Sequence, residues 1–191
     1  RLHSAEQMLS IVKTMKILAA TSIRDYECAV EALAMYTRTI ELGLQIALAD
    51  QKPVEVTEPL QGHHLGAIVF GSDQGLAGQF NERVARYTLS QINTFDDDWQ
   101  SRRVMAIGRR VTGYLTDGGI HVTEEISVPG SLDGVLAAGR RVLVIIKRWQ
   151  VRYGVERLVL FSNAPTSGAA YKPHMRWMLP VDPVWLRRLQ Q

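Results

Sequence analysis

The stretch from Met8 to Leu42, MLSIVKTMKILAATSIRDYECAVEALAMYTRTIEL, contains neither proline nor glycine. These two residues interrupt helices most strongly, so their absence favours one continuous helix. We predict that this helix fills residues 1–50 and ends before Lys52-Pro53. At 1.5 Å per residue, a helix of that length is roughly 70 Å long.

The apolar residues of this predicted rod follow a single stripe. Steps of four and three residues connect Met8, Val12, Met15, Ala19, Ile23, Tyr26, Val30, Leu33, Thr37, Ile40, Leu44 and Ala47. Alternation of fours and threes is typical of a coiled-coil seam. Between Met15 and Tyr26 the steps are four, four and three, a stutter that locally unwinds a left-handed supercoil. We therefore predict a long N-terminal coiled-coil helix.

The rest of the chain has a different period. Residues 51–64 contain prolines and predict a linker. Short apolar runs then predict strands at 65–70, 102–108, 118–128, 155–163 and 174–181, and amphipathic segments predict helices at 77–92, 109–115 and 132–152. Alternating strands and helices indicate an α/β class: a Rossmann-like, three-layer domain with a mainly parallel sheet over residues 65–181. Residues 182–191 predict the start of a further, truncated helix.

Within the segment 132–152, the apolar residues predict the side that faces the core. We expect this side to contain Val135, Leu136, Val142, Ile145, Ile146 and Trp149, and we expect Gly154 to end the helix.

A small α/β domain cannot bury an apolar stripe about 70 Å long. Either a second helix runs beside the rod or other proteins surround it, and this sequence contains no second helix of that length. We therefore expect partners, or self-association of the chain through its helix. A coiled-coil adaptor with no ring-shaped partner would share these properties.

The composition excludes several classes of function. The 22 basic and 19 acidic residues leave a net charge of +3, which is too small and too scattered to indicate binding to nucleic acid. The densest basic region, residues 102–157, is typical of solvated faces, with an acidic protein partner as the alternative. The chain has no apolar run long enough to insert into a membrane. With one cysteine, Cys28, no internal disulfide can form, and we expect a packed thiol.

The candidate catalytic and ligand-binding groups are weak. Gly71, Gly75 and Gly78 form a glycine-rich turn after the first strand, where dinucleotide folds bind phosphate. Their spacing is not G-x-G-x-x-G, and Ser72 does not lie in a nucleophile elbow. A structural or partner-binding turn is favoured, and a Rossmann-like nucleotide-binding enzyme with a helical extension remains the alternative.

Three further clusters have simpler interpretations. His63-His64 is not accompanied by other ligands at metal-binding spacing, and Asp96-Asp97-Asp98 does not match a calcium-binding loop. Glu124-Glu125 would point to opposite faces of a strand and would not converge. We predict no catalytic residue, no cofactor and no metal.

Two stretches resemble the gamma subunit of F-type ATP synthases. SIVKTMKILAATSIR (10–24) is similar to the start of that subunit, and SDQGLAGQFNERV (72–84) is similar to its second signature. MAIGRRVTGYL (105–115) and LVLFSNAPTS (158–167) look like later parts of the same domain. Gln74 stands where the family usually has arginine, and Ala77 stands where it often has cysteine. The segment DYECAVEAL (25–33) is less basic than usual, which favours a divergent, sodium-type branch.

The resemblance implies a central-stalk rotor without catalytic activity of its own, which couples ion translocation to ATP synthesis or hydrolysis. It implies as partners the alpha and beta subunits, the epsilon subunit and the c-ring, on the cytoplasmic face of a bacterial or archaeal energy-transducing membrane. The family's long C-terminal helix is not found in this sequence. By position, the resemblance implies partner contacts at Met15, Lys16, Arg24, Leu76, Ala77, Gly78 and Asn81.

Overall fold

The computed structural model describes residues 2–49, 64–95, 101–166 and 170–189. The chain divides into two compact units, one made of Arg1–Lys52 with Leu189–Gln191 and the other of Pro53–Arg188. Most of the predicted linker 51–64 lies outside the described residues, as do His63 and Asp96-Asp97-Asp98.

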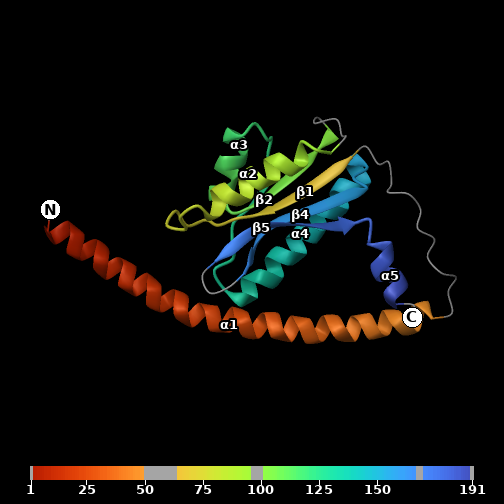
Figure 1. The fold of residues 1–191 in the computed structure, drawn as a ribbon, viewed down its shortest axis with the longest axis horizontal. Helices are drawn as coiled ribbons and strands as arrows, with labels where there is room; N and C mark the ends of the chain where they lie inside the picture. Colours follow the sequence, from red (N-terminus) through yellow and green to blue (C-terminus); the bar gives the residue numbers. More distant parts are fainter. Residues whose placement is uncertain (1, 50–63, 96–100, 167–169, 190–191) are drawn as a thin grey trace. The chain divides into compact units, whose positions relative to one another are not determined.

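The first unit contains one helix, α1 (Leu2–Leu48), which Figure 1 shows as a single unbroken rod. This agrees with the predicted long helix. The seam residues from Met8 to Ile40 that are large and apolar are all exposed. Three threonines on α1 hydrogen-bond to the carbonyl four residues earlier, for example Thr37 to Leu33 at 2.8 Å, so their hydroxyls need no outside partner.

The second unit is a three-layer α/β domain, which confirms the predicted fold class. Its sheet contains β1 (Leu65–Phe70), β2 (Arg103–Ile107), β3 (Glu124–Ile126), β4 (Arg157–Pro165) and β5 (Tyr171–Leu179) in the order β3-β2-β1-β4-β5. The first four strands are parallel and β5 is antiparallel to β4. The prediction for the last strand begins three residues late, because β5 pairs with β4 from Tyr171 onward.

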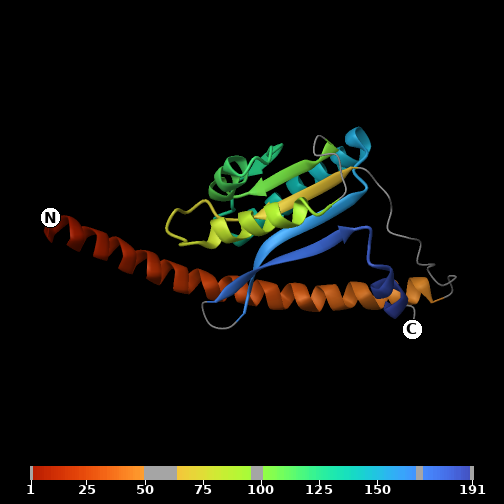
Figure 2. The same cartoon turned by 45° about the horizontal axis from the view of Figure 1, so that its top comes forward.

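Helices cover both faces of the sheet (Figures 1 and 2). On one face, α2 (Phe80–Ile92) and α3 (Arg109–Asp117) pack on Ala67, Val104 and Phe161. On the other face, α4 (Leu132–Tyr153) packs Ile145 and Trp149 on alternate strand residues such as Ile68 and Met105. Burial on both faces explains why the strands are continuous apolar runs instead of alternating ones.

The ends of α4 follow ordinary capping rules. The Gly134 N–H donates to the Ser131 hydroxyl at the start, and Gly154 ends the helix in a left-handed conformation with φ of 64°. The last helix, α5 (Pro183–Leu189), starts where the Val184 N–H donates to Asp182 Oδ1 at 2.8 Å.

One part of the prediction for α4 is wrong. Val135 and Leu136 are exposed, although we expected them on the buried side together with Ile145 and Trp149. The cause is that α4 carries apolar residues on two sides. The side with Ile145 and Trp149 faces the sheet, with Val142 and Ile146 partly buried beside them. Leu136 lies on another side of the helix.

Candidate functional site

The β1–α2 loop (residues 71–79) lies at the carboxyl ends of the parallel strands. Its first part is held by Asn81, which is only 4% exposed. The Ser72 N–H donates to Asn81 Oδ1 at 2.8 Å, and Asn81 Nδ2 donates to the Ser72 hydroxyl at 2.9 Å. The Asn81 amide is therefore used as both acceptor and donor inside the loop. We interpret it as a residue that shapes the loop, and its expected partner contact stays a prediction.

Asp73 connects the same loop to two distant segments. The Arg109 N–H, at the start of α3, donates to Asp73 Oδ1 at 2.7 Å. The Val128 N–H, after β3, donates to Asp73 Oδ2 at 2.9 Å. The residue before α3, Gly108, has no side chain that could cap the helix, so the Asp73 carboxylate takes the place of a local cap.

Glycines allow this close packing. Gly108 has φ of 116°, and a Cβ added there would lie 2.7 Å from the Ser72 backbone nitrogen. A Cβ added at Gly71 would lie 2.4 Å from the Val111 side chain. Both approaches are too short for a larger residue, so glycine is required at Gly108 by the backbone that it approaches and at Gly71 by the Val111 side chain.

The tip of the β1–α2 loop is presented to solvent. Leu76 is 77% exposed, Gly78 is exposed with φ of 53°, and Ala77 is half-buried. The base of the loop is thus fixed by side-chain hydrogen bonds while an apolar side chain projects from its tip. That arrangement suits contact with another protein better than capture of a small molecule.

The geometry does not suit the nucleotide-binding alternative. In Rossmann folds, phosphate binds at the helix N-terminus after the first strand, but Glu82 puts a carboxylate in the first turn of α2. The start of α2 is also packed directly against β4 and β5. Asn163 Nδ2 donates to the Phe80 carbonyl at 2.8 Å, and the Phe80 and Tyr171 rings meet edge to face at 5.1 Å.

The expected contact residues on α1 lie on the surface. Met15, Lys16 and Arg24 are all exposed, and so is Cys28. The expectation that Cys28 is a packed thiol is wrong, because the side chains around it on α1 are themselves exposed. Among the described residues, no group of three or more histidine, cysteine or acidic side chains could hold a metal ion.

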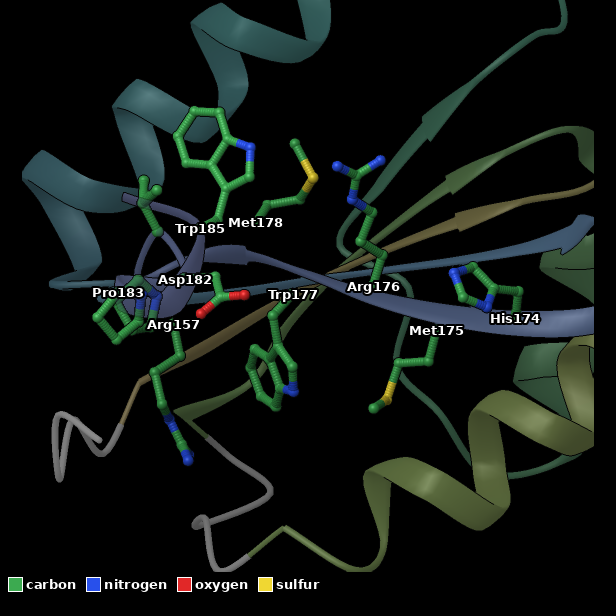
Figure 3. A pocket seen from close by; sticks show the side chains of 11 residues that line it. Arg157, His174, Met175, Arg176, Trp177, Met178, Asp182, Pro183 and Trp185 are labelled. Carbon is green, nitrogen blue, oxygen red and sulfur yellow. The ribbon is translucent and has the colours of Figure 1, made fainter. Parts of the chain in front are cut away.

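A hollow of about 920 Å³ lies around β5 and the start of α5 (Figure 3). The sequence did not predict it, since three elements supply its walls: β4 through Arg157, β5, and the start of α5. In Figure 3, Trp185, Met178 and Arg176 lie on one side of β5, while Trp177 and Met175 lie on the other. The charged side chains that line it, Arg157, Arg176 and Asp182, do not point toward one common centre in this view. No helix in the described part of the chain is both long and apolar enough to cross a bilayer.

Comparison with known proteins gives a consistent result. The family model described as ATP synthase matches residues 1–189. An "ATP synthase gamma chain" of Desulfitobacterium hafniense is 30% identical over 186 residues, which is 95% of this chain and 64% of the relative. The gamma chain of Aquifex aeolicus is 24% identical over 174 residues, or 90% of this chain and 60% of the relative. The chain thus spans about 60% of the length of these relatives.

Solved structures share the fold. The central stalk and c-ring structure of the Tetrahymena thermophila mitochondrial ATP synthase contains a chain that matches with a TM-score of 0.60 at 17% identity. The match covers 89% of this chain and 72% of that one. A rotor structure from Euglena gracilis mitochondrial ATP synthase matches with a TM-score of 0.51 at 15% identity, covering 85% of this chain and 60% of that one.

Proposed function

Because the chain belongs to the ATP synthase family, we propose that it acts as the gamma subunit, the central-stalk rotor of an F-type enzyme. The observation that carries this proposal is the exposed seam of α1 in a chain whose relatives are gamma chains. The rotor couples ion translocation to ATP synthesis or hydrolysis mechanically and makes or breaks no bond itself.

The physical properties of α1 support a shaft. A continuous helix of 47 residues is a stiff element of roughly 70 Å, and its seam has the spacing that a second helix requires. Turning inside a ring of alpha and beta subunits needs a rod that does not bend, and α1 contains no proline and a single glycine, Gly43, near its end. The stutter after Met15 loosens the supercoil locally and lets the shaft present unequal faces to the catalytic sites.

Two surfaces would contact the catalytic head. On α1, Met15, Lys16 and Arg24 would face the beta subunits. On the α/β domain, the exposed loop tip with Leu76, Ala77 and Gly78 would lie near the lower rim of the head. The rigid base formed by Asp73 supports this role, because a loop that transmits force must keep its shape under load.

The α/β domain would form the lower stalk beside the epsilon subunit and the c-ring. The protein would then be peripheral, on the cytoplasmic face of a bacterial or archaeal energy-transducing membrane. The sodium-type branch suggested by the sequence belongs to the same proposal.

Purification from the native membrane tests the proposal. The full-length protein carries an affinity tag and is extracted from membranes in mild detergent. We expect alpha and beta subunits to co-purify with it, together with ATPase activity. If the tagged protein is recovered without either subunit while both are present in the same extract, it is not the rotor.

The nucleotide-binding enzyme predicts a different result. Calorimetric titration of the purified protein with ATP, NAD and FMN should show no tight binding, since Glu82 and the Asn163–Phe80 contact occupy the places that a cofactor would need. A micromolar dissociation constant that maps to the β1–α2 loop would favour the enzyme.

A further inference from the structure

Helix α4 has more apolar surface than the sheet covers. Ile145 and Trp149 face the core, as described above. A second set of apolar side chains faces solvent, with Leu136 67% and Leu143 66% exposed. Leu132, Val144 and Val151 are also exposed. We call these five residues the outer face of α4.

The spacing along the outer face is regular. Steps of four, three and four residues connect Leu132, Leu136, Gly139 and Leu143, and the next position of this pattern, Ile146, is partly buried beside the sheet. This is the spacing of a heptad seam, which is the surface that a second helix packs against. Gly139 lies at the middle of the seam, and a Cβ added there would meet nothing within 4 Å, so another backbone could approach closely.

Two of the three charges in the row beside this seam, Arg140 and Lys147, are positive, and the third, Asp133, lies in the first turn of the helix. Arg140 and Lys147 are seven residues apart and flank the leucines in the position that makes ion pairs between coiled-coil helices. Both are exposed, and neither makes an ion pair within the described part of the chain. The acidic residue of α4, Asp133, lies in its first turn, where it complements the helix dipole.

We propose that the outer face of α4 binds an acidic amphipathic helix of a partner protein. The apolar side of that helix would pack on Leu136 and Leu143, and its glutamate or aspartate side chains would lie opposite Arg140 and Lys147. Arg140 and Lys147 belong to the basic region 102–157, so this proposal gives part of that region a function. This surface is separate from the α1 and loop contacts of the proposed rotor function.

A protein helix fits the outer face better than a lipid surface does. Interfacial helices insert an apolar face and keep their charges on the opposite, polar face. On α4, Arg140 and Lys147 lie between the leucine row and the row formed by Val144 and Val151. A bilayer would have to receive both cations at the centre of the inserted face, whereas a partner helix pairs them at its edge.

A designed peptide is the probe. It spans about three heptads, with leucine at the seam positions and glutamate at the flanking positions, and a matched peptide has lysine in place of glutamate. Binding to the full-length protein is measured by fluorescence anisotropy. We expect the glutamate peptide to bind and the lysine peptide to bind at least roughly tenfold more weakly, since like charges then face each other.

Variants assign the binding to α4. The double variant Arg140→Glu/Lys147→Glu should bind the glutamate peptide roughly tenfold more weakly than the parent protein does, and it should bind the lysine peptide more tightly. The control is Arg141→Glu/Arg152→Glu, which makes the same change in net charge on other sides of the same helix and should leave the preference unchanged. Circular dichroism and thermal unfolding of both variants establish that they fold.

Four results would overturn the proposal. The first is the absence of peptide binding. The second is a peptide affinity that does not change on charge reversal at Arg140 and Lys147, which would place the peptide on α1 or elsewhere. A third is binding to vesicles with about 30 mol% phosphatidylglycerol that depends on the same two residues while the peptide does not bind. The fourth is a concentration-dependent dimer that Leu136→Ser/Leu143→Ser abolishes, which would make a second copy the occupant.

Discussion

Replacing Asp73 by alanine tests whether the loop base is held as the structure indicates. The change removes two hydrogen bonds to a carboxylate, from the Arg109 N–H at 2.7 Å and from the Val128 N–H at 2.9 Å. Each bond to a charged group contributes about 1.5–3 kcal/mol when buried. Asp73 is half-buried, so water replaces part of each bond, and we expect a total loss of about 2 kcal/mol in the free energy of unfolding.

Urea unfolding of the protein measures this loss, which corresponds to a fall in melting temperature of about 8 °C for a domain of this size. Asp73→Asn keeps one acceptor oxygen and should lose about half as much. The control is Asp117→Ala at the end of α3, where an exposed acid opposes the helix dipole and its removal should cost nothing. Hydrogen exchange should quicken at Arg109 and Val128. If Asp73→Ala is as stable as Asp117→Ala, the carboxylate does not hold the loop.

Three further predictions concern single residues and the long helix. Gly78→Ala should lower the free energy of unfolding by about 1–2 kcal/mol, because φ of Gly78 is 53°. Gly113→Ala, inside α3 with open space around it, should raise that free energy by about 0.5–1 kcal/mol. Equal effects of the two substitutions in thermal unfolding would contradict the backbone conformation of the loop. Lys16→Glu in the assembled enzyme should impair ATP-driven ion pumping, while its free energy of unfolding stays within about 0.5 kcal/mol of that of the parent protein. Lys13→Glu is the control, and unchanged pumping by the Lys16 variant would show that Lys16 is not part of the proposed contact. Light scattering at increasing concentration should show self-association through α1, and a strictly monomeric mass with full helicity would contradict the seam.

The sequence predicted those features that depend on local pattern. The long helix α1, the buried strands β1, β2 and β4, and the end of α4 at Gly154 follow from periodicity and from glycine and proline placement. The resemblance to gamma chains, which came from two short motifs, is confirmed. The domain boundaries and the contact residues on α1 and the loop stay predictions.

The features that the sequence did not predict depend on contacts between distant residues. Asp73 is hydrogen-bonded to backbone groups 36 and 55 residues away, and no local pattern marks such partners. Leu136 is as apolar as a core residue, and only the way in which α4 packs on the sheet shows that its side chain faces solvent. Asn81 resembled a contact residue in a surface motif, but its amide turned inward to Ser72.

Because β5 runs in the reverse direction, the chain enters and leaves the sheet at the same end. Leu179 pairs with Leu158 and Gly66 pairs with the same residue of β4, so the chain enters β1 and leaves β5 at the same end of the sheet. Tension applied at these two points does not shear the strands along their length. It separates the strands starting from that end and breaks the hydrogen bonds between them one after another. The domain therefore resists pulling weakly in this direction, and its integrity under load depends on the flanking segments being held close together.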